Sequence, residues 1–256
     1  MVIIEENHSR AEAMASMPHL AALASRYGQA TNYSAITHPS LPNYLAIGAG
    51  DTFGITDDND PSSHPLSGQT VFGTTLGVGA TAKTYAESMP SNCDLTDYGN
   101  YAVRHNEWTY FTSTTERSAC NSFDVPMGTT TGGNLLSDIN AGTLPITGQM
   151  TPNVCDDAHD CSLTTADTWL NGWVSALMAG PDYTSGHLTI IVTFDEDDGS
   201  ANNNVAFVVI DPRLNGKTVT TAANHYSLTR WLNANAGTSL LRNAATATDL
   251  KSAFGL

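Results

Sequence analysis

The sequence predicts an α/β fold with a central, mostly parallel β-sheet sandwiched by helices. Short apolar runs rich in β-branched residues, typical of buried strands, recur along the chain, and helical patterns lie between them. The 256 residues are 41% hydrophobic, enough to bury one core without requiring a second. We therefore expect residues 1–256 to form a single domain.

The first half of the chain alternates strand and helix patterns. Residues 2–4 ("VII") predict a buried strand. Residues 18–28 ("PHLAALASRYG") predict a helix, with Pro18 in its first turn and Gly28 at its C-terminal cap. A second helix is expected to begin near residues 43–50 ("NYLAIGAG").

The second half continues this alternation. Residues 128–151 are rich in Gly and Thr and predict irregular surface structure. Residues 166–180 carry bulky apolar side chains at helical spacing, and a last helix is predicted at "HYSLTRWL". Residues 188–194 ("LTIIVTF") and 205–210 ("VAFVVI") predict two more buried strands.

The charge pattern argues against two classes of partner. The formal net charge is −15, and the three lysines, Lys83, Lys217 and Lys251, form no basic run. Nucleic acid is therefore not an expected partner. No apolar stretch approaches the roughly 20 residues that span a bilayer, so we expect no stable membrane insertion.

The four cysteines indicate an oxidising compartment. They form no CxxC pair, and the loops around them are rich in Thr, Ser, Asn and Gly. We predict two disulfides; of the three possible pairings, Cys93–Cys120 with Cys155–Cys161 closes the shortest loops, and four free thiols are the alternative. No signal-peptide pattern opens the chain. We expect a secreted, extracellular protein whose leader is absent from this sequence.

Carboxylates follow two of the predicted strands. The first strand runs into Glu5, Glu6, Asn7 and His8, and residues 188–194 run into the acidic segment 195–199 ("DEDDG"). Functional groups of such sheets gather beyond the carboxyl ends of the strands. Crowded carboxylates repel one another unless a cation or protons compensate, so this pattern predicts a divalent metal. The alternative is a solvated acidic turn.

A serine between two prolines is a candidate nucleophile. Pro39 and Pro42 restrict the backbone around Ser40, and the predicted helix start behind it offers free N–H groups that favour an anion. A serine hydroxyl ionised by a metal can attack phosphorus. The alternative is that Ser40 is only a helix N-cap.

Seven ordered motifs make the sequence similar to a known family. They are "IIEENHS", "HPSLPNYLAIGAG", "YAESMPSNC", "YAVRHNEWTYF", "PNVCDDAHDCS", "TFDEDDG" and "NHYSLTRWL", and together they extend from residue 2 to about residue 232. This pattern resembles the phosphoesterase family of bacterial phospholipase C and acid phosphatase, in the alkaline-phosphatase superfamily. The resemblance implies an alkaline-phosphatase-like fold and metal-dependent hydrolysis of phosphate esters.

The resemblance also implies roles for individual residues. Ser40 would be the nucleophile and form a phosphoserine. The implied metal ligands are Glu6, Asn7, Ser40, Asp195 and Glu196. Their oxygen atoms suit one divalent ion, Ca²⁺ or Mg²⁺, and carboxylates also bind Zn²⁺.

Further residues would surround the phosphate. His105 and His159 would stabilise its oxygens or protonate the leaving group, and Asn43 and His225 would bind substrate. His225 also fits a helix-start residue that points to solvent. The family usually has proline where this chain has Glu107, directly after the His105-Asn106 pair.

Some acidic residues and one histidine stay without an assigned role. Asp156 and Asp157, with His159 and His225, match remnants of a second metal site in the wider superfamily, although we favour one metal. His38 lies two residues before Ser40.

Three functions remain open on the sequence. The favoured one is a broad phosphomonoesterase acting on small phosphate esters, because no apolar loop stands out that would reach a phospholipid head group. A phospholipase C-type phosphodiesterase is the alternative within the same class. A catalytically inactive, secreted Ca²⁺-binding domain is the alternative from another class.

Overall fold

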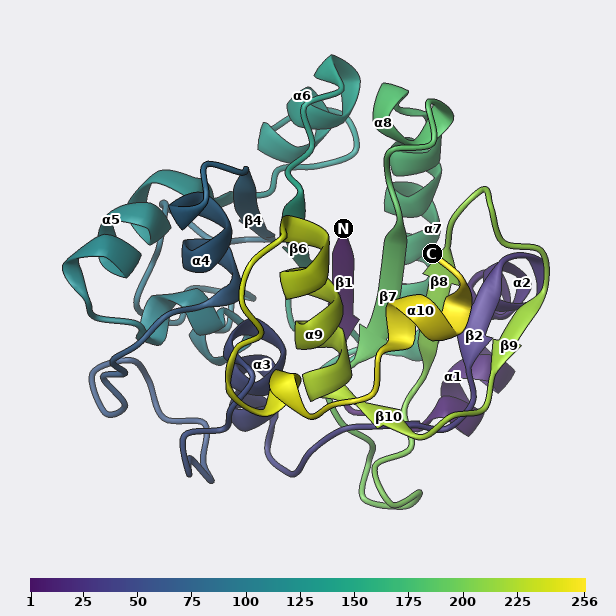
Figure 1. The fold of residues 1–256 in the computed structure, drawn as a ribbon, viewed down its shortest axis with the longest axis horizontal. Coiled ribbons are helices and arrows are strands. Elements are labelled where there is room, and N and C mark those ends of the chain that lie inside the picture. The colour runs from purple at the N-terminus through teal and green to yellow at the C-terminus, as the bar shows by residue number, and fades with distance from the viewer.

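A computed structural model describes residues 1–256 and contains one large sheet covered by helices on both faces (Figure 1). The strands of this sheet are β1 (Val2–Glu5), β2 (Gly28–Ala30), β4 (Ala82–Ala86), β5 (Asp124–Pro126), β6 (Thr147–Thr151), β7 (Ile190–Phe194), β8 (Phe207–Ile210) and β9 (Lys217–Val219). Strands β3 (Tyr33–Ser34) and β10 (Ala223–Asn224) form a separate parallel pair.

The strand order confirms the predicted fold class. The eight strands run β5-β4-β6-β1-β7-β8-β2-β9, and every neighbouring pair is parallel except the two pairs that involve β8. The three strands predicted from apolar runs correspond to β1, β7 and β8. All residues of these three strands are buried, as their continuous apolar sequences require.

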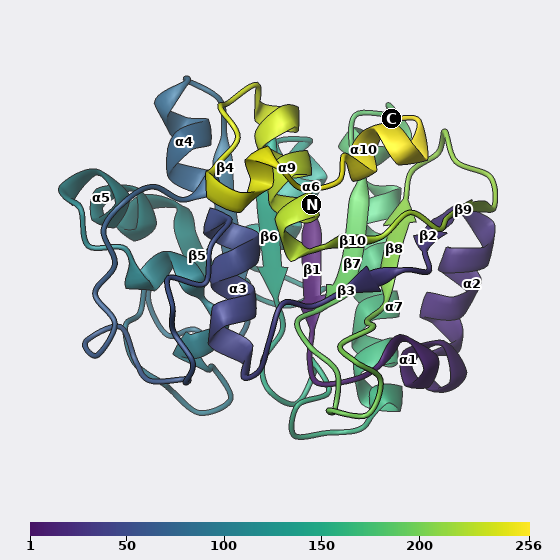
Figure 2. The same cartoon turned by 60° about the horizontal axis from the view of Figure 1, so that its bottom comes forward.

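Helices cover both faces of the sheet. They are α1 (Arg10–Ser16), α2 (Pro18–Arg26), α3 (Ser40–Ala49), α4 (Val71–Gly77), α5 (Thr114–Phe123), α6 (Asn134–Ala141), α7 (Leu163–Ala179), α8 (Pro181–Thr184), α9 (His225–Ala236) and α10 (Leu250–Phe254). Three 3₁₀ turns are η1 (Val103–His105), η2 (Glu107–Tyr110) and η3 (Arg242–Ala245). Helices α3, α4 and α9 pack together over one face, and α1, α2 and α7 pack over the other (Figure 2).

The prediction for residues 128–151 was wrong. This segment contains α6 and also β6, which pairs with β1 and β4 in the middle of the sheet and is buried at every residue. The sequence of β6 (TGQMT) has no apolar run, so its pattern does not indicate a core strand. Gly148 belongs there because a Cβ atom would lie 2.9 Å from the side chains of Met1 and Pro145.

The predicted cap of α2 was also wrong. Pro18 opens the helix as expected, but Tyr27 is the C-cap and Gly28 is the first residue of β2. A Cβ atom on Gly28 would lie 3.0 Å from the Phe254 ring and 3.2 Å from the carbonyl oxygen of Lys217. Close packing of β2 explains this glycine better than a left-handed cap does.

Two disulfides join the chain as the shortest-loop pairing predicts. Cys93 is bonded to Cys120, and Cys155 is bonded to Cys161. No cysteine is free. Among the helices, none has both the length and the apolar character needed to cross a bilayer.

Glu107 is a buried acid at the back of α3. A Cβ atom on Gly48 would collide with the Glu107 side chain, so the glycine makes room for the carboxyl group. Gln149 donates to Glu107 Oε2 (3.0 Å), whereas Glu107 Oε1 and Gln149 Oε1 are buried without partners. Burial raises the pKa of Glu107 to about 8. The carboxyl group is therefore protonated at neutral pH.

This raised pKa leads to a prediction about stability. A raised folded-state pKa stabilises the fold below the ordinary value of 4.5, and this contribution is lost as the pH rises through about 8. Each tenfold difference in proton affinity between the folded and unfolded states corresponds to about 1.4 kcal/mol. Glu107→Gln should therefore raise the melting temperature above about pH 8 and change it little near about pH 5. Thermal unfolding measured across this range is the test, and an equal effect at both ends would contradict the prediction.

Candidate active site

Three loops meet at the carboxyl ends of the central strands, the edge opposite the N-terminus in Figure 2. Glu6 follows β1, Asp195 follows β7, and Asp157 lies in the loop after β6. The N–H of Glu6 donates to the carbonyl oxygen of Asp157 (2.8 Å), and the N–H of Asn7 donates to Asp195 Oδ1 (3.2 Å). Asn7 turns the chain here in the left-handed region, at a φ of 57°.

Ser40 is delivered to this edge by the first turn of α3. Pro39 is the N-cap of the helix and Ser40 is the first helical residue. Ser40 is 3% exposed and its side chain caps no helix; its hydroxyl donates to Glu6 Oε2 at 2.9 Å. The alternative of a helix-capping side chain is thus excluded.

The negative charge of the acidic side chains around Ser40 is not balanced by the hydrogen-bond donors of the protein. Glu6 Oε1 and Asp195 Oδ2 are buried and accept no hydrogen bond. Burial, followed by the charge of Asp195, raises the pKa of Glu6 well above its ordinary value. Burial raises the pKa of Asp195 to about 6, opposed by hydrogen bonds from the N–H groups of Asn7 and Glu196. Either protons or a cation must stabilise this arrangement.

These oxygen atoms fit a divalent cation. Of the predicted ligands, the structure brings Glu6, Ser40 and Asp195 together, with two buried carboxylate oxygens free to bind. An all-oxygen donor set suits a hard cation. A second group, Glu6 with His105 and Asp157, has its candidate ligand atoms within 4.8 Å of one another.

Glu196 lies beside this group and is held by its neighbours. Asn43 donates to Glu196 Oε2 (3.0 Å), and His38 Nδ1 lies 3.2 Å from Oε1. Burial, followed by the charge of Asp195, raises the pKa of Glu196 to about 9. Asn7 contributes its backbone to the site, whereas no hydrogen bond of its side chain is seen.

Asn43 braces the loop before α3. Its Oδ1 accepts from the N–H groups of Ile36 (2.9 Å) and Thr37 (3.2 Å), and its Nδ2 donates to the carbonyl oxygen of Thr37 (2.8 Å) as well as to Glu196. All of its polar atoms therefore have partners in the protein. Its predicted role in substrate binding stays a prediction.

His105 sits deep in the site between two acids. Its Nε2 lies 3.4 Å from Glu6 Oε1 and its Nδ1 lies 3.3 Å from Asp157 Oδ2, although neither contact has hydrogen-bond geometry. The Tyr44 ring stacks on the imidazole at 5.1 Å. Burial, then Arg104, lowers the pKa of His105 well below its ordinary value. The ring is therefore neutral at neutral pH.

The other two predicted histidines differ in exposure. The His159 side chain is 29% exposed, with its ring centroid 5.9 Å from that of His105, and its Nδ1 lies 2.7 Å from Asp160 Oδ1. His225 is fully buried, between the Tyr33 hydroxyl (2.9 Å) and the carbonyl oxygen of Asp195 (2.6 Å). The alternative of a solvent-facing His225 was wrong, because its position at the first turn of α9 faces the sheet.

Some residues of the site were missed or left without a role. Tyr44 is one helical turn after Ser40 and so shares its face of α3, which is a signal available in the sequence. His38 bridges Glu196 and Asp197, with its Nε2 3.3 Å from Asp197 Oδ1. Burial raises the pKa of Asp157 to about 7.

Glu5 does not join the group around Ser40. Consecutive side chains of a strand point to opposite faces, so Glu5 faces the α7 side while Glu6 faces α3. Both oxygens of Glu5 are buried without donors. Burial, then the charge of Asp157, raises the pKa of Glu5 well above its ordinary value.

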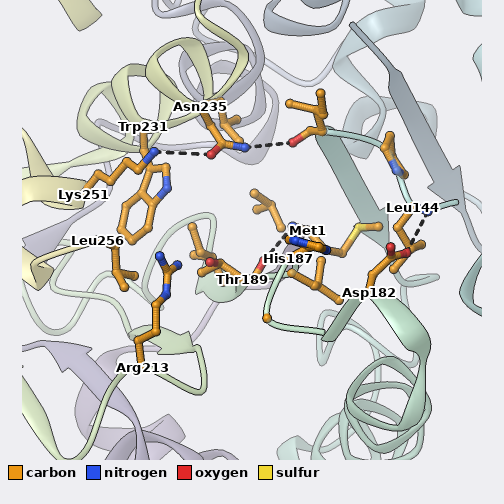
Figure 3. A pocket seen from close by; sticks show the side chains of 17 residues that line it. Met1, Leu144, Asp182, His187, Thr189, Arg213, Trp231, Asn235, Lys251 and Leu256 are labelled. Carbon is orange, nitrogen blue, oxygen red and sulfur yellow. Dashed lines mark hydrogen bonds between the residues drawn. The ribbon is translucent and has the colours of Figure 1, made fainter. Parts of the chain in front are cut away.

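A cavity of about 490 Å³ lies far from this site (Figure 3). Its lining includes Met1, Leu144 and Leu188, which precede β1, β6 and β7, so it opens at the amino ends of the strands. Arg213 and Trp231 form part of the opposite wall. None of the predicted site residues lines it.

Comparisons with known proteins agree with the family that the sequence motifs indicate. The model of the Phosphoesterase family matches residues 10–237. The chain is 32% identical over 236 residues to the phosphatidylinositol-3-phosphatase of Mycobacterium tuberculosis, covering 89% of this chain and 73% of that protein. It is 33% identical to the phosphate-repressible acid phosphatase of Penicillium chrysogenum (81% and 51% covered) and 30% identical to an acid phosphatase of Aspergillus fumigatus (84% and 49%). The chain thus spans about half the length of these two fungal relatives.

Solved structures share the fold at low sequence identity. A protein in the alkaline phosphatase superfamily from Vibrio parahaemolyticus superposes with a TM-score of 0.61 at 11% identity, covering 95% of this chain and 69% of that chain. The lipoteichoic acid synthase LtaP from Listeria monocytogenes gives 0.62 at 9% identity, covering 96% and 75%. The alkaline-phosphatase-like fold predicted from the motifs is confirmed.

Proposed function

Since the chain belongs to the Phosphoesterase family and is therefore a hydrolase of phosphoric ester bonds, we propose that it cleaves phosphate monoesters through a phosphoserine formed on Ser40. One observation carries this proposal. The buried Ser40 hydroxyl donates to Glu6 Oε2, beside the unpartnered oxygens Glu6 Oε1 and Asp195 Oδ2. The proposed nucleophile therefore lies beside two carboxylate oxygens that are available to bind a cation.

The residues of the chain orient the attack. The Ser40 proton points at Glu6, which leaves the lone pairs of Oγ free to face phosphorus. A divalent cation held by Glu6, Ser40 and Asp195 would lower the pKa of the hydroxyl and neutralise charge on the phosphoryl group. Asn43 keeps the loop before α3 in place through its contacts with Ile36 and Thr37.

His105 and His159 have separate roles in the proposed mechanism. We assign to the neutral, buried His105 a hydrogen bond to a phosphoryl oxygen, because its ring nitrogens have no hydrogen-bond partner in the protein. We assign proton transfer to the departing alcohol to the partly exposed His159, whose Nε2 lies 3.2 Å from the Arg104 guanidinium and must leave that donor to act. Water then hydrolyses the phosphoserine.

A phospholipid substrate is the second candidate, on a specific observation. Leu95 (41% exposed) and Tyr98 (63% exposed) lie on the segment between β4 and η1, which leads directly to His105. The carbonyl oxygen of Asn100 on this segment accepts from the N–H of Val154, in the loop that carries Asp157. Exposed apolar side chains such as these two are what contact with a lipid surface would use.

We also propose that the protein is secreted and forms a single domain. Two disulfides are expected in an oxidising compartment, where they form and persist. The proposed partners are small phosphate esters, with neither nucleic acid nor stable membrane insertion. An inactive Ca²⁺-binding domain is the alternative that an activity assay decides.

A substrate panel tests the proposed function. We expect purified protein supplied with Ca²⁺, Mg²⁺ or Zn²⁺ to hydrolyse p-nitrophenyl phosphate faster than bis(p-nitrophenyl) phosphate or phosphatidylcholine vesicles, because the proposed cation would neutralise the second negative charge that a monoester carries and a diester lacks. Faster hydrolysis of the diester or of the lipid would instead establish a phosphodiesterase. No hydrolysis with any of these ions would establish the inactive domain.

A further inference from the structure

We propose that Arg104 binds the third nonbridging oxygen of a phosphate monoester and thereby selects monoesters over diesters. This inference rests on the proposed function and names a residue that determines its substrate class. Arg104 is the middle residue of η1 (Val103–His105), directly before His105. Of the arginine and lysine side chains, only that of Arg104 donates to a residue of the candidate active site.

A series of short distances connects Arg104 with the proposed nucleophile. The Arg104 guanidinium donates to His159 Nε2 at 3.2 Å, and the His159 ring centroid lies 5.9 Å from that of His105. His105 Nε2 lies 3.4 Å from Glu6 Oε1, and Glu6 Oε2 accepts from the Ser40 hydroxyl. Burial, followed by the positive charge of Arg104, lowers the pKa of His105. The charge of Arg104 therefore acts at the centre of the site.

Most of the hydrogen-bonding capacity of Arg104 is unused in the protein. A guanidinium group carries five N–H donors, and Arg104 uses only its Nη2, on His159. Arg104 forms no ion pair, although the net charge of the chain is −15. Arg213, by contrast, donates to both carboxylate oxygens of Asp211. The free donors of Arg104 suit an anionic oxygen of the substrate.

The oxygen atoms of a monoester include one for which Arg104 is the available donor. The phosphoryl group of a monoester has three nonbridging oxygens. In the proposed function one of them faces the cation between Glu6 and Asp195, and another accepts a hydrogen bond from His105. The third oxygen carries charge only in a monoester, because a second ester bond occupies it in a diester. A guanidinium contact to this oxygen therefore favours monoesters.

The same contact would release His159 for its proposed role. His159 Nδ1 lies 2.7 Å from Asp160 Oδ1, which places the ring proton on Nδ1 and leaves Nε2 to accept from Arg104. A phosphoryl oxygen is negatively charged and imidazole Nε2 is neutral, so the guanidinium would move to the phosphoryl oxygen when substrate binds. Nε2 can then take a proton from solvent and deliver it to the departing alcohol.

Two substrates with the same leaving group test this assignment. We expect Arg104→Gln to lower kcat/KM for p-nitrophenyl phosphate about 100-fold, and kcat/KM for methyl p-nitrophenyl phosphate less than about tenfold. Arg104→Lys should recover part of the loss, because lysine keeps the charge without the forked donors. If the diester reacts too slowly to measure, its inhibition constant replaces kcat/KM in the comparison.

Two further variants serve as controls. Arg26→Gln removes the same charge from an exposed side chain that lies over the Tyr27 ring, and it should leave both kcat/KM values unchanged. His159→Ala should lower both values by the same factor, because both substrates release the same alcohol. An equal loss for both substrates in Arg104→Gln would show that Arg104 acts only through His159 or the fold. That result, or an unchanged kcat/KM for the monoester, would overturn the proposal.

A binding measurement separates this proposal from the proposed function. If the unmodified protein hydrolyses neither ester with Ca²⁺, Mg²⁺ or Zn²⁺, the proposed function fails by itself. Calorimetric titration of the metal-loaded protein with inorganic phosphate then tests Arg104. Binding that Arg104→Gln weakens about tenfold or more, and that Arg26→Gln leaves unchanged, would support an anion contact at Arg104. Absence of binding, or equal binding by Arg104→Gln, would refute it.

Discussion

Ser40→Ala should lower kcat by about four to six orders of magnitude, because covalent catalysis loses its reacting atom. The fold should change little, since the Ser40 hydroxyl makes one hydrogen bond, to Glu6, and caps no helix. We expect the free energy of unfolding to change by no more than about 1–2 kcal/mol. Steady-state kinetics on p-nitrophenyl phosphate and thermal unfolding of the same preparation measure both effects.

Ser113→Ala is the matched control, because the Ser113 side chain caps a helix and the Ser40 side chain does not. Its hydroxyl accepts from the N–H of Glu116 and caps α5. Removing a helix cap costs about 0.5–2 kcal/mol of stability and should leave turnover unchanged. If Ser40→Ala instead behaves like Ser113→Ala, with normal turnover and a lower melting temperature, Ser40 is not the nucleophile.

Removal of the metal should abolish activity and lower the melting temperature together. Glu6 and Asp195 present buried oxygens without donors, so a cation bound only to the native state would stabilise it. A ligand at 100 times its dissociation constant contributes about 2.7 kcal/mol. Elemental analysis of the purified protein, with thermal unfolding and activity before and after chelation, provides the measurement. Full activity in metal-free protein would refute metal dependence.

The chelated protein should also show a specific pH dependence. The folded-state pKa of Asp195, about 6, lies above its ordinary value of 3.8. The stabilisation from its protonated form is present below the ordinary value and is lost as the pH rises through about 6. Metal-free protein should therefore be less stable near neutral pH than near about pH 4–5, and added metal should remove this difference.

Two variants of the same acidic segment separate the metal site from general charge effects. Asp195→Asn should lose metal and activity, because it removes a buried charge at the proposed shell. Asp198→Asn changes the charge equally, but Asp198 is exposed and bonds only to Ser200. We expect Asp198→Asn to keep both metal and activity.

Local sequence patterns alone predicted three core strands, a helix, the disulfide pairing and the family. Continuous apolar runs predicted β1, β7 and β8, because strands buried on both faces exclude polar residues. The apolar run of residues 43–50 predicted helix α3, although the helix begins three residues earlier, at Ser40. The spacing of the cysteines favoured the observed pairing. The ordered motifs indicated the family, since each is a short contiguous string.

The tertiary structure alone decided what depends on distant contacts. Strand β6 is buried because β1 and β4 flank it, and its sequence shows no apolar run. The strand pleat, together with the helices that cover each face, separates Glu5 from Glu6. His105 meets Glu6 and Asp157 across long stretches of chain, and His225 is buried against Asp195. A local sequence pattern shows which side chains a segment contains. Their burial and their contact partners are decided only when the folded sheet brings separate segments to one edge.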